Sequence, residues 1–329
     1  MISRLASGRL ILLALKYIVG VGIIYFLVSS GNINLATISD LPLDLVMGCL
    51  GLMVVQTVVG AVRVQRLLAS QGILFTTVRC AIFNCAGLFY SLFLPGGISG
   101  DAVRAYYFMQ SSEDRRMPIL GALFLDRLIG LIAMVGLGVV AALVLALSVP
   151  MIRPYILAFI GIFFAFAAVL LVSRLLGHLH VPDQMGVRWY GKLWVHLTKL
   201  VASLHLTRYP VRVMMHTVLL SFVVQITAAL IIYLCAVYVQ AGLSLLEVSA
   251  VAPVGLLVNA IPISPGGLGV GEKGFEVLFR GLQGSHGATA FLTSRLFLYS
   301  PALIGAVYSL QRLFLNRQHR TKAVIAVGQ

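Results

Sequence analysis

The sequence has 329 residues, of which 60% are hydrophobic and only 10% are charged, and its mean hydropathy is +1.01. Soluble domains carry about a quarter charged residues, so this composition excludes them and indicates a polytopic membrane protein. The net charge of +14 does not indicate nucleic-acid binding, because Lys and Arg lie mostly in short loops beside apolar segments, as the positive-inside rule requires. Anionic lipid is the expected partner.

Cysteine and histidine patterns give no sign of a metal site. The four cysteines lie singly in apolar segments, without the paired spacing of a ligand set or a disulfide framework. His178 and His180 are close together, but no pattern of carboxylates surrounds them. We therefore expect no metal, no cofactor and no catalytic residue, and no nucleotide-binding motif is present.

Two apolar segments at the N-terminus set the orientation. The first continues to about residue 28 behind basic residues, and is expected to be a transmembrane helix and not a cleaved signal peptide. The second is predicted at about 43–62, with Arg63, Arg66 and Arg79 after it in a cytoplasmic loop. The loop at 29–42 has no Lys or Arg, so we expect it outside the cell and the N-terminus in the cytoplasm.

The next apolar segment, residues 80–94, is too short to cross a bilayer comfortably and has basic residues on both sides. It predicts a re-entrant hairpin that enters from the cytoplasm. Residues 117–149 and 155–173 are then expected to cross outward and back. The basic stretch 174–214 is expected in the cytoplasm. It contains a predicted amphipathic helix at 193–204 that lies either on the inner leaflet or against the underside of the bundle.

The second half follows the same order from the other side. Residues 215–240 are predicted to cross outward, and the apolar pair 248–262 and 268–282 to re-enter from outside. A last span at about 288–312 returns to a basic cytoplasmic tail, residues 313–329. The sequence thus predicts six full spans and two re-entrant hairpins.

A motif written twice supports this arrangement. LPGGISGDAVR occupies residues 94–104 and SPGGLGVGEKG occupies residues 264–274, both inside apolar stretches. Irregular backbone at membrane depth must be buried in protein or line a wet cavity, and paired breaks in corresponding halves indicate a transport site near the midplane. We predict an all-α polytopic bundle with one membrane domain, residues 1–312. It comprises two inverted repeats, about 1–149 and 150–312, each with a re-entrant helical hairpin.

Ionisable residues concentrate around these breaks. Each charge at the centre of a membrane helix costs on the order of 2.5–3.5 kcal/mol, so they must pair, face water or meet a charged ligand. Arg127 and Arg295 follow the two breaks at similar distances and are expected in equivalent roles. The glycines are expected to let backbones approach closely and to leave amide N–H groups free for an anion.

The candidate substrate-binding residues are Pro95, Gly96, Gly97, Asp101, Arg104, Asp126 and Arg127 in the first half, and Pro265, Gly266, Gly267, Gly269, Glu272, Lys273, Glu276 and Arg295 in the second. The alternative is that the charges form structural ion pairs. For Asp126 and Arg127 that alternative has equal weight, because adjacent residues point to different faces and one of them could pair with Arg104 or Asp101.

The segments LPGGISGDAVR, FLDRLIG and PISPGGLGVGEKGFE resemble the integral membrane domain of the lysylphosphatidylglycerol synthase family. This flippase-like domain forms the N-terminal part of multiple peptide resistance factor proteins and also occurs alone. The resemblance covers essentially the whole chain and implies lipid translocation or a part in envelope-lipid modification. The residues that match the family motifs are Pro95, Gly96, Gly97, Asp101, Arg104, Arg127, Pro265, Gly266, Gly267, Gly269 and Glu272.

The leading hypothesis is a lipid translocase of the cytoplasmic membrane, in which the arginines contact a lipid phosphate. No aminoacyl-transferase domain follows residue 312, so we do not expect lysyl transfer by this chain. One alternative is a membrane-embedded glycosyl- or phosphotransferase with a polyprenyl-linked donor, in which Asp101 and Glu272 would be bases or metal ligands. Another is a non-transporting scaffold for a lipid-modifying enzyme.

Overall fold

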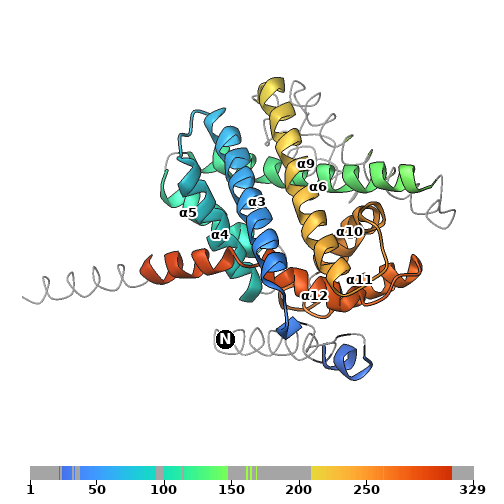
Figure 1. Ribbon diagram of the computed structural model, residues 1–329. Helices are drawn as coiled ribbons and strands as arrows, with labels where there is room; N and C mark the ends of the chain where they lie inside the picture. The colour runs from blue at the N-terminus through green and yellow to red at the C-terminus, as the bar shows by residue number, and fades with distance from the viewer. Residues whose placement is uncertain are drawn as a thin grey trace, which may run out of the picture.

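In the residues that it describes, the computed structural model consists of helices joined by turns and short irregular segments, with no strand (Figure 1). The described residues are 38–93, 99–112, 115–146, 209–261 and 263–312, with residues 22, 24–31, 33, 161, 164 and 168. The all-α prediction is confirmed for them. Most of the predicted first span and of the span at 155–173 lies outside the described residues. So do the first Pro-Gly-Gly, the amphipathic helix at 193–204 and the tail 313–329.

Among the described residues, three helices are long and apolar enough to cross a membrane: α3 (Leu43–Ala69), α6 (Arg116–Leu145) and α9 (Val211–Tyr238). A fourth candidate is α12 (Gly287–Leu298) together with the helix Ala302–Arg312, which meets it at 43°. We predicted one continuous span there. The bend falls next to Pro301, whose ring nitrogen has no proton to donate to a helical hydrogen bond.

The long helices α3, α6 and α9 meet at one end of the molecule, and α3 and α9 also meet at the other. At one end, Arg66 of α3 lies 3.4 Å from His216 of α9, and Arg115, before α6, donates to the carbonyl of Gln71 at 3.3 Å. We call this the basic end. At the other end, the Tyr238 hydroxyl of α9 donates to the carbonyl of Asp40, before α3, at 3.0 Å. We call this the acidic end.

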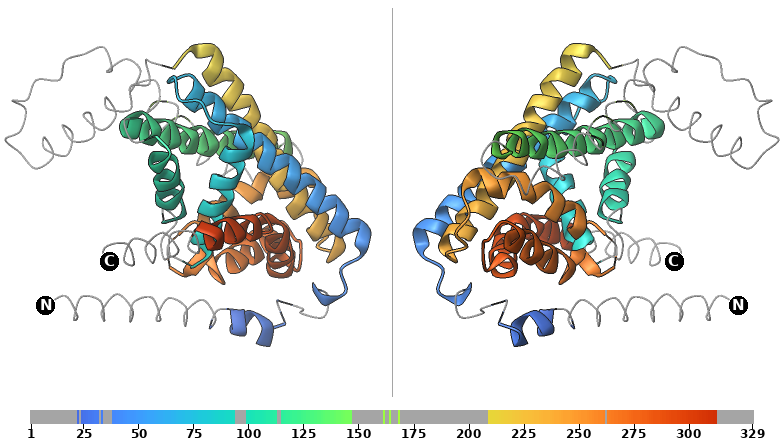
Figure 2. Two further views of the ribbon diagram at one scale, coloured as in Figure 1. Left: turned by 90° about the vertical axis from the view of Figure 1, so that its left-hand side faces the viewer. Right: turned by 90° about the vertical axis from the view of Figure 1, so that its right-hand side faces the viewer.

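The helices that meet at these ends also pack against one another along their length. Helices α3 and α9 lie side by side in each view (Figures 1 and 2). Near the basic end, aromatic rings fill the space between α3, α4 and α5. Phe108 meets Phe75 and Phe83 edge-on, with ring centroids 5.2 and 4.9 Å apart. Such rings bury large apolar areas in a specific geometry, so they fix the position of the short helices that carry the site.

The first short pair is α4 (Thr77–Phe93) and α5 (Ser99–Gln110). Helix α4 starts just after α3 ends, and Gln110 at the end of α5 accepts a hydrogen bond from Arg312 at 2.6 Å. Both outer ends of the pair therefore lie at the basic end. A Cβ atom on Gly87 would lie 2.8 Å from the carbonyl oxygen of Gly100, so the two helices touch backbone to backbone.

The second short pair is α10 (Leu245–Asn259) and α11 (Val270–Gly281), joined through the 3-10 turn η4 (Pro265–Gly267). The amide of Ser285, after α11, donates to the carbonyl of Ala241, before α10, at 3.0 Å. Both outer ends of this pair therefore lie at the acidic end. The two pairs therefore enter the bundle from opposite ends.

The second break lies against the first hairpin. A Cβ atom on Gly266 would lie 3.8 Å from the Cα atom of Leu92, near the end of α4. Leu92 precedes the first Pro-Gly-Gly by three residues. The tip of the second hairpin thus meets the inner end of α4 within the bundle, between the basic and acidic ends.

Candidate functional site

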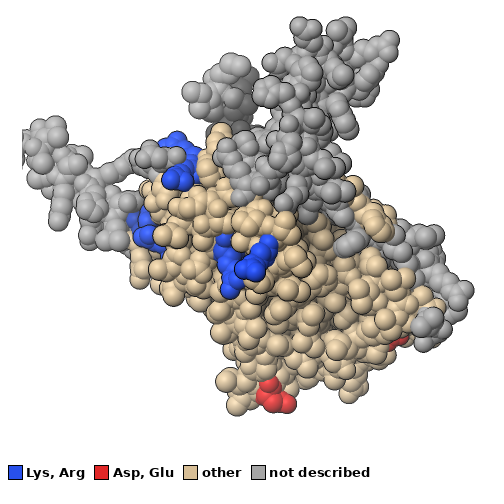
Figure 3. Space-filling view, turned by 90° about the horizontal axis from the view of Figure 1, so that it is seen from above, with Lys and Arg blue, Asp and Glu red and all other residues tan. Residues whose placement is uncertain are grey.

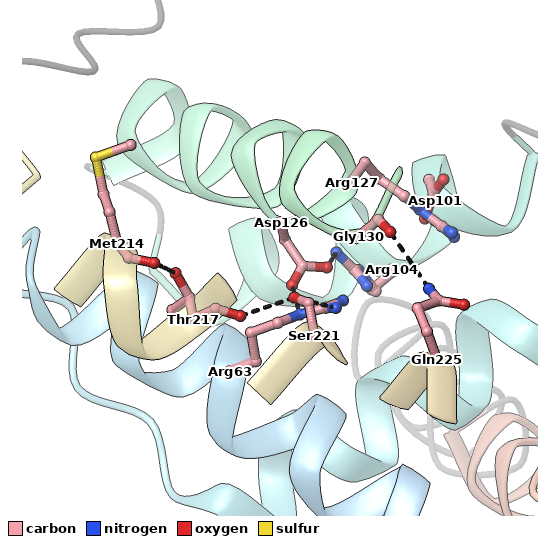
Figure 4. Close-up of polar contacts among 10 residues, drawn as sticks. All are labelled: Arg63, Asp101, Arg104, Asp126, Arg127, Gly130, Met214, Thr217, Ser221 and Gln225. Carbon is pink, nitrogen blue, oxygen red and sulfur yellow. Dashed lines mark hydrogen bonds and ion pairs between the residues drawn. The ribbon is translucent and has the colours of Figure 1, made fainter. Parts of the chain in front are cut away.

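Three charged residues meet between the helices of the first half (Figure 4). Asp126 of α6 is fully buried. Its Oδ1 atom lies 2.6 Å from Nε of Arg63 on α3, and its Oδ2 atom lies 2.9 Å from a terminal nitrogen of Arg104 on α5. Arg63 also donates to the Ser221 hydroxyl of α9 at 2.9 Å. Four helices therefore converge on one carboxylate.

This Arg63–Arg104–Asp126 cluster carries one more positive than negative charge. The side chains of Arg63, Arg104 and Asp126 are only 12%, 9% and 1% exposed. Within the part of the chain that the structure describes, the buried Nε of Arg104 has no hydrogen-bond partner. Since a buried charge is costly unless it is paired, the arrangement offers a place for an anion.

Asp126 and Arg127 do not pair with each other. Arg127 turns to the other side of α6 and donates from Nε to Asp101 of α5 at 2.9 Å and from a terminal nitrogen at 2.5 Å. This pair is more open than the cluster, with side chains 58% and 26% exposed. The sequence suggested Arg104 and Asp101 as possible partners. In the structure Arg104 pairs with Asp126, and Asp101 pairs with Arg127.

In the second half, a buried ion pair follows the second Pro-Gly-Gly break. Nε of Arg295 on α12 lies 2.8 Å from a carboxylate oxygen of Glu272 on α11, and both side chains are less than 10% exposed. Arg295 also donates to the side-chain oxygen of Asn259 at the end of α10. Its guanidinium lies over the rings of Phe291 and Tyr299, at 5.1 and 5.5 Å from their centroids.

The same pairing therefore occurs twice. Asp101 is in the first turn of α5, the helix after the first break, and binds Arg127 of the next helix. Glu272 is in the first turn of α11, the helix after the second break, and binds Arg295 of the next helix. A carboxylate in a first turn also suits the positive end of the helix dipole. Each arginine thus binds the first-turn carboxylate of the preceding helix, Arg127 from the interior of α6 and Arg295 from the last turn of α12.

Other residues predicted to bind substrate take part in hydrogen bonds with main-chain amides. The Glu276 carboxylate accepts from the amide of Ala288 at 2.9 Å and from Arg280 at 2.7 Å, so it caps the start of α12. The amide of Gly269 donates to Glu272 at 2.7 Å, and the amide of Gly267 donates to the carbonyl of Ser264 at 3.2 Å. The expectation that the glycine amides are free for an anion is wrong at these two positions.

Glycine is needed in the second break for its backbone geometry. Gly266, Gly267 and Gly269 have φ angles of 57°, 71° and 82°, a region that other residues rarely adopt. Lys273 of α11 is exposed and lines a cavity of about 720 Å³ whose other described walls are mostly valine, glycine and leucine. Pro95, Gly96 and Gly97 lie outside the described residues.

Sequence reasoning missed Arg63, Ser221 and Asn259. Arg63 was expected in a cytoplasmic loop, but α3 continues to Ala69 and leaves the Arg63 side chain only 12% exposed. The signal was present in the apolar residues that continue beyond Arg63, among which Val64 and Leu67 are in the core. Among the described residues, no group of three His, Cys, Asp or Glu could hold a metal ion.

Comparison with known proteins identifies the chain by its membrane region. Residues 13–305 match a family model described as the lysylphosphatidylglycerol synthase TM region. A comparison with curated proteins found no match.

Proposed function

The chain belongs to the lysylphosphatidylglycerol synthase TM region family, and from this premise we propose that it is a lipid translocase. It moves a phosphate-bearing lipid between the leaflets of the cytoplasmic membrane, in envelope-lipid modification or biogenesis. A lipid that crosses keeps its tails in hydrocarbon but must carry a polar head through a region where charge is expensive. The protein lowers that barrier with charged groups inside the bundle.

The excess positive charge of the Arg63–Arg104–Asp126 cluster is the observation that carries this proposal. Two arginines share one buried carboxylate, and Arg104 keeps an unpartnered Nε within the described structure. A phosphate oxygen would accept from that nitrogen and balance the charge, because guanidinium and phosphate form strong charge-assisted hydrogen bonds. Arg104 is therefore the principal phosphate contact of the proposal.

The two hairpins supply access from either side. In the proposal, Arg127 and Arg295 contact the phosphate at later stages, while Asp101 and Glu272 balance them when no lipid is bound. The hairpins enter from opposite ends and meet where Gly266 lies beside Leu92, as alternating access between inverted repeats requires. We propose that residues 1–149 and 150–312 are related by an axis in the membrane plane.

The basic end is assigned to the cytoplasm by the positive-inside rule. Arg66, Arg115 and Arg212 lie at the ends of α3, α6 and α9 that meet there. We propose that both termini lie in the cytoplasm, as the sequence predicts, and that the second hairpin enters from outside. Lys273, in the apolar cavity beside α11, would meet the head group from the outer side.

The test is leaflet exchange of labelled phospholipid in liposomes, without any donor sugar, so that translocation is separated from transferase activity. Arg104→Gln should slow exchange by about ten-fold or more, because a buried hydrogen bond to a charged group contributes about 1.5–3 kcal/mol. It should leave the melting temperature in detergent nearly unchanged, because Arg63 still pairs with Asp126.

Arg116→Gln is the matched control, since it removes one exposed arginine at the start of α6 and should exchange lipid like the parent protein. An Arg104→Gln variant that melts much lower but exchanges lipid normally per folded molecule would contradict the proposal. In that case the cluster would be a structural ion network.

A further inference from the structure

A second group of arginines lies at the basic end, away from the cluster. It surrounds a pocket of about 330 Å³ between the start of α4 and the helix Ala302–Arg312. Arg79 and Arg312 supply the charge, and Phe83 and Tyr308 supply part of the apolar wall. None of the residues of the Arg63–Arg104–Asp126 cluster is among those that line it.

Both guanidinium groups are held in place by neighbours other than carboxylates. Arg79 lies over the ring of Phe75, at 5.9 Å from its centroid. Arg312 lies over the ring of Tyr308 at 5.6 Å and donates to Gln110 at 2.6 Å. In the part of the chain that the structure describes, neither arginine takes part in an ion pair. Two positive charges thus face one pocket without an acidic partner among the described residues.

The residues around the pocket indicate which kind of anion it would bind. Val78, which lines the pocket, is 68% exposed, and nearby Leu74 is 85% exposed. Exposed apolar residues beside arginine and tyrosine are typical of the boundary between acyl chains and head groups. The volume admits a head group with its phosphate but not a whole lipid, so acyl chains would stay in the bilayer beside Val78.

We propose that this pocket binds the phosphodiester head group of an anionic phospholipid of the cytoplasmic leaflet. The site is separate from the proposed translocation path. A bound head group would bridge Arg79 at the base of the first hairpin to Arg312, and so hold the hairpin against the helix that follows α12. The lipid would stabilise the arrangement of the hairpins and would not itself be carried.

The experiment measures lipid binding to the purified full-length protein in detergent by native mass spectrometry and by thermal unfolding. Phosphatidylglycerol should bind and raise the melting temperature increasingly with its concentration, whereas phosphatidylcholine should give a much smaller shift. Inorganic phosphate at the same concentration should give none, because it lacks the apolar part.

The double variant Arg79→Gln with Arg312→Gln should lose about ten-fold or more in phosphatidylglycerol affinity, since two charge-assisted contacts are removed. Arg116→Gln, at the same end but outside the pocket, should keep the parent affinity. The single variant Arg79→Gln, which leaves the Arg312–Gln110 contact intact, serves if the double variant does not fold.

Equal affinity of the parent and the Arg79→Gln variant would overturn the site, as would equal shifts with phosphatidylcholine or with inorganic phosphate. Lipid exchange in liposomes distinguishes this from a failure of the proposed function. Loss of the pocket should leave lipid exchange by folded protein largely in place, whereas Arg104→Gln should slow exchange by about ten-fold or more with the pocket intact.

Discussion

The two arginines bound to Asp126 depend on that carboxylate because they would otherwise repel each other inside the bundle. Arg63 and Arg104 come from α3 and α5, and each contacts a different oxygen of Asp126. Removal of one partner from a buried ion network leaves an uncompensated charge, which is much more costly than the network itself is stabilising. The three residues therefore have unequal roles: Asp126 holds the cluster together, and Arg104 is the residue that we propose contacts a ligand.

Asp126→Asn should lower the free energy of unfolding by about 3–5 kcal/mol, because it leaves two buried arginines without a carboxylate. Thermal unfolding in detergent measures the effect. Asp101→Asn is the matched control and should cost at most about 1 kcal/mol, since the Arg127–Asp101 pair is partly exposed. Similar losses in the two variants would contradict the distinction between a buried cluster and an open pair.

At the scale of helices, glycine residues allow the two helices of each hairpin to lie close together. Gly87 of α4 and Gly100 of α5 face each other, and a Cβ atom on Gly87 would also lie 3.0 Å from Cβ of Arg104. In the second hairpin, a Cβ atom on Gly274 would lie 2.9 Å from Val258 of α10. Close backbone approach through small residues is the usual way in which membrane helices associate. Gly87 and Gly100 thus allow α5, which carries Arg104, to lie close against α4.

Gly87→Ala tests this packing, because helix propensity and packing predict opposite signs. Alanine in a helix gains up to about 1 kcal/mol over glycine, whereas overpacking costs about 1–3 kcal/mol. We expect a net loss of stability and slower lipid exchange, since the added methyl group pushes against Gly100 and Arg104.

Gly51→Ala in α3 is the control, because a Cβ atom there would have no neighbour within 4 Å, and it should be neutral or stabilising. Equal stability of the two variants would show that α4 and α5 tolerate a wider spacing than the structure shows.

At the scale of the whole molecule, charge separates the two ends. Figure 3 shows Lys and Arg side chains gathered on part of the surface, while the visible acidic side chains lie at its margin. Asp40 lies beside the end of α9, and Glu247 caps the start of α10. Because the outer ends of the first hairpin lie at the basic end and those of the second at the acidic end, we expect the two hairpins to face opposite sides of the membrane.

Cysteine labelling tests this topology, and the four native cysteines are buried and should react little. Thr76→Cys and Ser111→Cys, at the outer ends of the first hairpin, should both react only from the cytoplasmic side. Ser244→Cys and Ser285→Cys, at the outer ends of the second, should both react only from outside. Reaction of the two members of either pair from opposite sides would show that the hairpin crosses the membrane.

The sequence alone determined the class of protein, the positions of most helices and the family. Apolar length and composition are local properties, so α6 and α9 were predicted within a few residues of their observed ends. The break at Pro265 and its glycines also follow from local backbone chemistry. The inverted symmetry and the cytoplasmic position of the termini stay predictions.

Only the tertiary structure decided which charges meet. Arg63 and Asp126 are 63 positions apart, and Arg104 and Asp126 are 22 apart, so no local pattern could pair them. Arg63 was predicted in a loop because a charged residue within a membrane span is energetically costly. That cost is offset here because another helix places a carboxylate beside it. Glu272 and Glu276 were both predicted to bind substrate, but they have different partners, and these too depend on which helix lies beside them. Arg295 of α12 meets one, and the start of α12 meets the other.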